Sequence, residues 1–490
     1  MSYQLIAIQI VFTCKSTQLA LTSPKLSRNA INCLCAWQST CKKIQQFLFR
    51  EALSAIPIER PGFSVDILPD SDLLPGMSDT LSKKPTTHRK PPNKSTVNPG
   101  ALTRLRAGII GTGFIAPVHI EALKRLGVQV SAICGSTKGA RALADKWGIT
   151  EVYGEYDFRS MYRSPNIDVV HITSPNKVHV EQSIAALAAG KHVVCEKPLG
   201  MDTRETAQLL KAIQKAGSTC PVFAVNYMCR FFPAVLQMRA MVQRGELGRI
   251  IHVQGHFFQD WLLKETDYNW RVLASEGGKL RAVGDIGTHW IDAVSFILGA
   301  RAEAVFATLE TFHKTRVRPK GEVKTFAKVN PKDAEPYRVD TEDFASVLLK
   351  FGESEHGFAN GVHANASVSQ VTAGWKCSLY LGIYGTKASV QWDLQQPNEI
   401  IVGRRDEPNQ ILQRATAGFS EDVAGYTDYP GGHPEGFPDS HKMHYRAIYE
   451  HIASDRQTPV LFATAEDGHH EVQLCEAILK SNVKRAWVEV

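Results

Sequence analysis

Short apolar runs alternate with helical patterns between residues 105 and 228. Apolar runs typical of buried strands occupy residues 106–110, 128–134, 167–172, 192–195 and 222–225. Amphipathic patterns that predict helices lie between them, at residues 116–126, 138–147, 178–189 and 203–216. Strands that alternate with helices through short connections indicate βαβ units. We therefore predict an α/β Rossmann domain with a doubly wound parallel sheet over residues 105–228.

The pattern changes after Tyr227. Helical patterns at residues 233–244, 291–298, 441–452 and 466–483 are separated by extended stretches at 250–258, 304–311, 346–351, 357–368, 377–384 and 389–392. Extended runs without crossover helices favour antiparallel pairing. Residues 229–490 are thus predicted to form an α+β domain with a large, mainly antiparallel open sheet. Residues 314–340, rich in Lys, Pro and Glu, are expected to form an exposed excursion.

Residues 1–104 differ in composition from the rest. The first 50 residues contain no Asp or Glu, and residues 77–100 are rich in Lys, Pro, Thr, Asn and Ser, which is typical of disorder. One interpretation is an upstream segment that does not belong to the working protein, with Met77 as its start. The other is a mitochondrial presequence, since such segments are basic, rich in Ser and poor in acids.

The positive charge of the chain belongs to that extension. Residues 1–104 carry 13 Lys and Arg against 6 Asp and Glu, whereas the remaining residues carry 43 of each. The body therefore has no electrostatic signature of nucleic-acid binding, and no apolar run is long enough to span a membrane. The cysteines of the body are scattered, which indicates free thiols in a reducing compartment. We expect no metal site and a cytoplasmic location, or a mitochondrial one if the presequence is genuine.

A glycine-rich turn follows the first predicted strand. It has the sequence Gly111-Thr112-Gly113-Phe114-Ile115-Ala116 and opens a helix. The first glycine permits a tight turn, the second lets the backbone approach a pyrophosphate, and a small third residue lets helix and strand pack closely. The helix N-terminus offers N–H groups and a positive dipole end to phosphates. The turn predicts a site for NAD or NADP.

The residues after the second strand bear on the choice between these cofactors. An Asp or Glu usually stands there when the ribose 2′-OH of NAD is bound. Here Ser136 and Lys138 follow Cys134-Gly135, and Arg141 lies nearby. A hydroxyl and two cations can accept the 2′-phosphate of NADP, or the two cations can be a solvated helix face. We expect NADP to be tolerated.

Polar residues also follow the next two strands, where ligands bind in such sheets. Ser174, Pro175 and Asn176, with His179 three residues on, follow one strand, and Glu196 and Lys197 follow the other. All six are candidate cofactor-binding residues. Lys197 is also a candidate catalytic residue, because an ammonium beside the nicotinamide can donate to a substrate oxygen that gains negative charge.

Asp285 and His289 are four residues apart and share one face if the segment is helical. An imidazole can take the proton of an alcohol while a hydride leaves its carbon, and a neighbouring carboxylate can orient that imidazole. The same spacing also occurs in structural hydrogen bonds.

Together, these motifs resemble the Gfo/Idh/MocA family of oxidoreductases. The resemblance rests on the glycine turn, Ser174-Pro175-Asn176 with His179, Glu196-Lys197-Pro198, and Asp285, Gly287, His289 and Asp292, and it covers roughly residues 105–490. It implies that Lys197, Asp285 and His289 match the family's catalytic set. It also implies a homodimer or homotetramer assembled through the C-terminal sheet.

Four further segments, at residues 340–343, 369–374, 403–409 and 431–436, resemble a sugar-oxidising branch of the family. This resemblance implies that His433 faces the substrate and that Trp270 and Arg271 line the same cleft. With Arg230, these residues would offer an aromatic platform and several hydrogen-bonding groups to a polyhydroxylated ring.

The leading hypothesis is an NAD(P)-dependent dehydrogenase of a cyclic sugar or polyol, with the hydride passing to nicotinamide and the proton to His289. A glycoside hydrolase that recycles its cofactor and a catalytically silent NAD(P)-sensing regulator are the alternatives. The full set of Lys197, Asp285 and His289 argues against the regulator.

Overall fold

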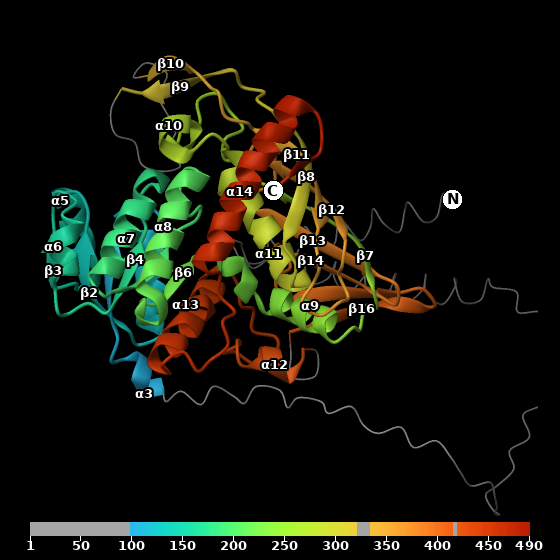
Figure 1. Ribbon diagram of the computed structural model, residues 1–490, viewed down its shortest axis with the longest axis horizontal. Coiled ribbons are helices and arrows are strands. Elements are labelled where there is room, and N and C mark those ends of the chain that lie inside the picture. The colour runs from blue at the N-terminus through green and yellow to red at the C-terminus, as the bar shows by residue number, and fades with distance from the viewer. Residues whose placement is uncertain (1–98, 321–333, 415–418) are drawn as a thin grey trace, which may run out of the picture. The chain divides into compact units, whose positions relative to one another are not determined.

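The computed structural model describes residues 99–320, 334–414 and 419–490 (Figure 1). The interpretations of residues 1–98 therefore lie outside the described residues. The described chain begins with a helical turn, α3 (Pro99–Leu102), whose Leu102 is buried in a core shared with α4 and α13. Packed structure thus starts a few residues before the predicted boundary at residue 105.

The first sheet is parallel, with the order β3-β2-β1-β4-β5-β6. Its strands are β1 (Arg106–Ile110), β2 (Gln129–Cys134), β3 (Glu151–Tyr153), β4 (Val169–Ile172), β5 (His192–Cys195) and β6 (Phe223–Val225). Its helices are α4 (Ala116–Arg125), α5 (Thr137–Trp147), α6 (Phe158–Tyr162), α7 (His179–Ala188) and α8 (Thr203–Ala216). The predicted Rossmann fold is confirmed. The short β3 and α6, too brief to show a period, were not predicted.

The second sheet has nine strands in the order β16-β15-β14-β13-β7-β12-β11-β8-β17, and only the β12–β7 pair is parallel. The strands are β7 (Ile250–Phe258), β8 (Ala302–Glu310), β11 (Phe344–Phe351), β12 (His363–Ser369), β13 (Ser378–Gly385), β14 (Ser389–Asp393), β15 (Glu399–Arg404), β16 (Glu407–Gln413) and β17 (Val488–Glu489). The helices of this part are α9 (Pro233–Gln243), α10 (Ala274–Gly277), α11 (Thr288–Leu298), α12 (Glu421–Ala424), α13 (Phe437–Ala453) and α14 (Ala465–Lys484). The mainly antiparallel sheet is confirmed as well.

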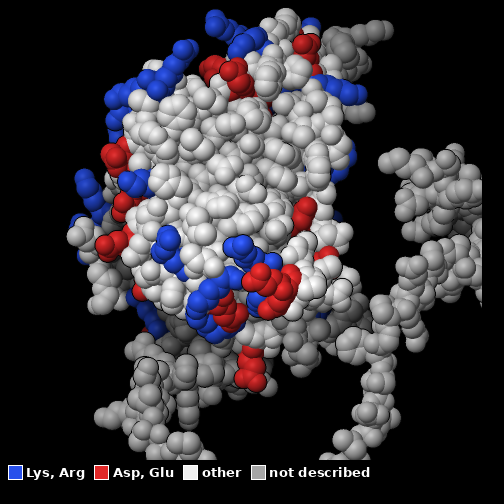
Figure 2. Space-filling model, turned by 90° about the vertical axis from the view of Figure 1, so that its right-hand side faces the viewer, with Lys and Arg blue, Asp and Glu red and all other residues white. Residues whose placement is uncertain are grey.

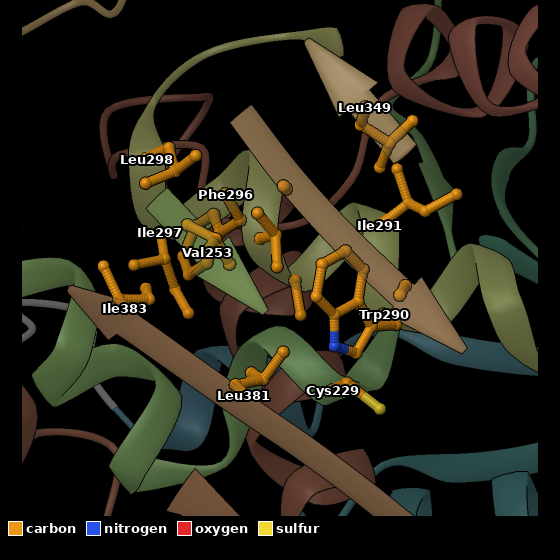
Figure 3. Packing of buried hydrophobic residues seen from close by; sticks show 14 of the residues in the cluster. Cys229, Val253, Trp290, Ile291, Phe296, Ile297, Leu298, Leu349, Leu381 and Ile383 are labelled. Carbon is orange, nitrogen blue, oxygen red and sulfur yellow. The ribbon is translucent and has the colours of Figure 1, made fainter. Parts of the chain in front are cut away.

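One face of this sheet is packed against α9, α11 and α14 (Figure 1). Trp290 of α11 lies in the centre of that core, among Val253, Leu381 and the side chains shown in Figure 3. Its indole Nε1 donates to the carbonyl of Tyr380 at 2.9 Å. A Cβ at Gly255 would lie 2.3 Å from that nitrogen, so only glycine fits there. Trp290 thereby fixes the start of α11, which carries the preceding residue His289.

The prediction that residues 314–340 form an exposed excursion is partly wrong. The described parts of this segment form a hairpin of β9 (Thr315–Pro319) and β10 (Ala334–Arg338). Arg316 of this hairpin is fully buried and donates to Asp343 Oδ1 at 2.9 Å and to the carbonyl of Leu262 at 2.8 Å. The sequence did not indicate that this arginine is buried, because it stands in a run of charged residues. Its carboxylate partner, Asp343, lies outside that run.

Helix α13 packs against the first domain, although it follows the second sheet in the sequence. Its residues Tyr445, Ile448 and Tyr449 belong to the core around β1, β2 and α4. The backbone N–H of Val225 in β6 also donates to Ala463 beyond α13, at 2.8 Å. The expected division at residue 228 thus omits a helix that completes the first core. None of the described helices is long and apolar enough to cross a bilayer.

Candidate active site

The glycine turn after β1 leaves room for a ligand. Gly111 has a φ of +103°, and a Cβ there would lie 2.5 Å from the carbonyl oxygen of Thr173, so glycine is required. At Gly113 a Cβ would meet no atom within 4 Å, because the backbone faces open space. Helix α4 begins beyond the turn without a side-chain cap. This uncapped end and open backbone fit a dinucleotide pyrophosphate.

A cleft of about 580 Å³ runs from this turn into the second domain. Twelve of the residues predicted to bind cofactor or substrate line it: Gly111, Thr112, Gly113, Phe114, Ile115, Ser174, Pro175, Asn176, Glu196, Lys197, Trp270 and Arg271. The cleft is also lined by residues that the sequence did not single out, among them Tyr156, Phe158, Gln182 and Glu276. Tyr156 lies in the loop after β3, and the others lie in α6, α7 and α10; no motif marks them.

Lys197, which lines the cleft, contacts Asp285. Its Nζ donates to the carbonyl oxygen of Asp285 at 2.5 Å and to the carboxylate Oδ1 at 3.0 Å. Asp285 lies in the π-helical turn η6 (Val283–Gly287), directly before α11. The Nε of Arg271 also lies 3.1 Å from Asp285 Oδ1. Burial raises the pKa of Asp285, but the charges of Lys197 and Arg271 outweigh it and hold the pKa at about 2.

His289 lies on α11, one turn beyond Asp285, with the edge of its ring against Tyr227. Burial, with the nearby ammonium of Lys197, lowers the pKa of His289 to about 3, although the charge of Asp285 raises it. Its Nδ1 lies 3.8 Å from the sulfur of Cys229. The Asp285 carboxylate contacts Lys197, Arg271 and Gln370, and an orienting hydrogen bond to His289 is not among its contacts in the described residues. The imidazole is neutral at pH 7, as a proton acceptor must be.

Two buried side chains fix the turn that carries Asp285. The Glu342 carboxylate accepts from the backbone N–H of Arg281 at 2.9 Å and from that of Val283 at 2.8 Å. The Nε2 of Gln370 donates to Asp285 Oδ2 at 2.8 Å. Both residues lie in segments that the sequence analysis linked to a sugar-oxidising branch. Their positioning contacts could not be predicted, because they join residues more than 50 positions apart.

Comparison with known proteins places this geometry in a family. The model described as an oxidoreductase family with an NAD-binding Rossmann fold matches residues 105–224, and that of the GFO/IDH/MocA C-terminal domain matches residues 235–391. The chain belongs to the Gfo/Idh/MocA family. It is thus an oxidoreductase of an NAD-binding family, as the sequence motifs indicated.

Curated relatives of this Gfo/Idh/MocA chain include dehydrogenases of sugars and polyols. Levoglucosan dehydrogenase of Pseudarthrobacter phenanthrenivorans is 28% identical over 415 residues, which cover 79% of this chain and 99% of that protein. Inositol 2-dehydrogenase of Salmonella typhimurium is 32% identical over 157 residues, 31% of this chain and 46% of that enzyme.

Solved structures agree with this relationship. Levoglucosan dehydrogenase in complex with NADH and L-sorbose has a TM-score of 0.69 at 25% identity, and the match covers 79% of this chain and 98% of that one. An oxidoreductase domain protein from Kribbella flavida also has a TM-score of 0.69, at 26% identity and with 79% and 99% covered.

Eight of the predicted residues are absent from the lining of the cleft in the described part of this Gfo/Idh/MocA chain: Ser136, Lys138, Arg141, His179, Arg230, Asp285, His289 and His433. The Ser136 hydroxyl caps α5 by accepting from the N–H of Gly139 at 3.2 Å. Lys138 and Arg141 are exposed on α5, and His433 is exposed in the loop before α13.

His179 and Arg230 are occupied by structural contacts. His179 is fully buried, with Nδ1 2.9 Å from the carbonyl of Pro198 and Nε2 2.8 Å from that of Ser174. It therefore links the loop after β4, which contains Ser174, to the loop after β5, which contains Pro198. Arg230 is 7% exposed, and its guanidinium donates to both carboxylate oxygens of Asp292 at 2.6–3.1 Å. The Nε and Nη2 donors of Arg230 are thus committed to Asp292, and Nη2 also donates to Asp467 at 3.2 Å.

Glu196 is held by a buried polar network. Its Oε1 accepts from His119 Nε2 at 2.9 Å and from Asn226 Nδ2 at 2.5 Å. The Nδ1 of His119 lies 2.9 Å from Nδ1 of His171, whose Nε2 lies 3.0 Å from the hydroxyl of Tyr449. Burial raises the pKa of Glu196, but His119 and Lys197 outweigh it and hold the pKa well below its usual range. The carboxylate is thus an anchored anion directly before Lys197.

The segment that contains η5 (Trp270–Val272) and α10 is fastened to the first domain across the cleft. Asn176 Nδ2 donates to the carbonyl of Gly277 at 2.9 Å, and Lys177 pairs with Glu276 at 2.7 Å. Within the segment, the Arg271 guanidinium lies over the Trp270 ring, 4.4 Å from its centroid. These contacts place one aromatic ring and several donors in the wall of the cleft.

Proposed function

We propose that this chain oxidises a hydroxyl group of a cyclic sugar or polyol, with NAD or NADP as the hydride acceptor. The observation that carries the proposal is the contact of Asp285 with Lys197, which lines the same cleft as the glycine turn, with the neutral imidazole of His289 on the next turn. The hydride and the proton of the alcohol need separate acceptors. The cofactor, when bound, supplies the first, and His289 supplies the second.

The side chains around Lys197 have separate roles in the proposed reaction. Lys197 donates to the substrate oxygen, which gains negative charge as its proton leaves. Asp285 and the Gln370 amide hold Lys197 in place. His289 takes the hydroxyl proton, because burial keeps its imidazole neutral. The carbon–hydrogen bond and the oxygen–hydrogen bond both break, so a carbonyl product, reduced cofactor and one proton are formed.

The substrate class is inferred from the wall of the cleft and from the relatives. Trp270 offers an apolar surface, while Arg271 and Lys197 offer donors beside it. A ring that carries several hydroxyl groups suits this mixture. The relatives named above are dehydrogenases of levoglucosan and of inositol, both of which are cyclic polyols.

A substrate panel tests the proposal. Pyranoses, anhydrosugars, inositols and hydroxy acids are incubated with the purified chain and NAD or NADP, and absorbance is followed at about 340 nm. We expect reduced cofactor to form with at least one cyclic polyol. Activity with hydroxy acids only would exclude the sugar assignment. Release of free sugar without net reduction would indicate the hydrolase, and tight cofactor binding without turnover would indicate the regulator.

We also propose that the open face of the large sheet assembles copies of this chain. One row of residues across that face, from β8 to β15, carries no charge: Phe306, Leu348, Asn365, Gln254, Gly382, Gln391 and Ile401. Figure 2 shows this side of the molecule, where uncharged residues cover the centre and charged ones gather towards the edge. An uncharged face of this kind is typical of a subunit interface.

Light scattering during size-exclusion chromatography tests the assembly. Leu348→Lys should convert a dimer or tetramer into smaller species, whereas Val460→Lys, which changes an exposed valine outside both sheets, should not. A monomeric wild-type chain would contradict the proposal.

A further inference from the structure

The loop after β3 places an acidic residue, Glu155, near the end of β2, where the chain itself has no Asp or Glu. Beyond the paired strands, the N–H of Gly135 donates to the carbonyl of Tyr153 at 3.1 Å, and the N–H of Tyr156 donates to that of Gly135 at 2.9 Å. This pairing sets Glu155 beside the start of α5. The hydroxyl of Thr137 donates to Glu155 Oε1 at 2.5 Å.

The backbone of this loop adopts a conformation that is unfavourable for residues with a side chain. Glu155 and Tyr156 have φ values of +50° and +56°, in the left-handed region that residues with a Cβ seldom adopt. A Cβ at Gly154 would lie 2.6 Å from the hydroxyl oxygen of Thr137, so glycine is needed where the loop meets α5. Strained backbone of this kind persists where the surrounding structure fixes it, and it is concentrated at binding sites.

The position of the loop relative to the glycine turn indicates which ligand Glu155 would meet. Thr112 of that turn packs closely against the end of β2, since a Cβ at Gly135 would lie 2.5 Å from its methyl group. Tyr156, next to Glu155, lines the same cleft as Thr112. In Rossmann domains the ribose of the adenosine lies beside the end of the second strand. Glu155 is exposed at that end.

We propose that Glu155 recognises the adenosine ribose by accepting a hydrogen bond from the 2′-OH of NAD and repelling the 2′-phosphate of NADP. The inference rests on the proposed function, because it concerns the cofactor of the same cleft. It opposes the expectation of NADP tolerance drawn from Ser136, Lys138 and Arg141. The Ser136 hydroxyl accepts a backbone hydrogen bond within α5, and of the three exposed charges Glu155 is the one that the Thr137 hydroxyl holds beside the end of β2.

The test compares the binding of NAD⁺ and NADP⁺ by isothermal titration calorimetry at low salt. The wild-type chain should bind NAD⁺ more tightly. In Glu155→Gln, which keeps the shape of the side chain but removes its charge, NADP⁺ affinity should rise by about 5-fold or more, and NAD⁺ affinity should fall by a smaller factor. Asp145→Asn is the matched control, because it removes one exposed negative charge from the far part of α5. It should leave the affinity ratio unchanged.

Salt provides a second readout. If charge repulsion excludes the 2′-phosphate, the preference of the wild-type chain for NAD⁺ should shrink as ionic strength rises, and that of Glu155→Gln should change less. Tight NAD⁺ binding with the same affinity ratio in the wild type and Glu155→Gln would overturn the inference and leave the proposed function intact. A wild-type chain that binds neither nucleotide would overturn both.

Discussion

The ammonium of Lys197 is bound by two oxygens of one residue, the backbone carbonyl and the carboxylate of Asp285. The two residues are 88 positions apart, one at the end of β5 and the other in the π-helical turn before α11. This contact ties the first domain to the second beside the cleft that Lys197 lines. It also fixes the ammonium group that we propose donates to the substrate oxygen.

The first prediction concerns this lysine. Lys197→Met should lower kcat by about 100-fold or more, the usual scale for a group that stabilises charge or moves a proton in the transition state. Cofactor affinity should change little, because the glycine turn stays intact. Stopped-flow kinetics and calorimetry measure the two effects. Lys177→Met is the control, since Lys177 lines the same cleft but forms a half-exposed ion pair with Glu276. Equal losses in both variants would contradict a special role for Lys197.

The second prediction concerns pH and His289. A pKa of about 3 means that the imidazole loses no acceptor capacity between pH 8 and pH 5. The acid limb of the kcat/KM profile should therefore not lie near pH 6.5, the ordinary value for histidine. His289→Asn should lower kcat by about 100-fold or more at every pH in this range. An acid limb near pH 6.5 in the wild type that vanishes in the variant would show that burial does not hold the imidazole neutral.

The third prediction concerns Gln370, which donates to Asp285 Oδ2. Gln370→Leu removes a hydrogen bond to a charged group, so kcat should fall by about 10-fold, in line with the energy of such bonds. The KM for the substrate should change less, because Gln370 is not among the residues that line the cleft. Gln396→Leu, at an exposed position after β14, is the matched control. A change confined to KM would place Gln370 at the substrate instead.

The fourth prediction separates structure from substrate binding at Arg230. Arg230→Met leaves Asp292 buried without its main cation, and the free energy of unfolding should fall by about 3–5 kcal/mol. Urea denaturation measures this loss, and Arg230→Met combined with Asp292→Leu should recover part of it. A higher KM for the substrate with unchanged stability would indicate instead that Arg230 binds the substrate.

The fifth prediction concerns the stability of the fold in acid. Burial lowers the pKa of His441 to about 4 in the folded chain, whereas the unfolded chain has the ordinary value near 6.5. The unfolded state therefore binds the proton first as pH falls, and stability is lost below pH 6.5. His441→Asn keeps a donor for the carbonyl of Phe437, which Nδ1 approaches to 3.0 Å.

Chemical denaturation at pH 7 and pH 5 checks this. Between these values the wild type should lose about 2 kcal/mol more than His441→Asn, from the difference between the two pKa values. Equal losses in the two proteins would show that His441 titrates alike in the folded and unfolded states.

The parts of the fold that rest on local pattern could be predicted from the sequence. The strand at β1, the glycine turn and the start of α4 were all foreseen, because a buried run, a tight turn and a helix N-terminus each depend on neighbouring residues. Lys197 was placed at the binding edge because it follows a parallel strand, and Asp285 was assigned to the same site because the motifs resemble those of a family.

The tertiary structure alone decided which polar groups remain available for a ligand. The sequence offered Arg230 as a substrate ligand, but Asp292 occupies it. It offered no acid after β2, but the β3 loop places Glu155 beside Thr137. The Rossmann turn and the order of the motifs can be recognised from the residues alone, since both depend on local spacing. Pairing between distant side chains depends on how strands and loops meet in space, and no local period records it.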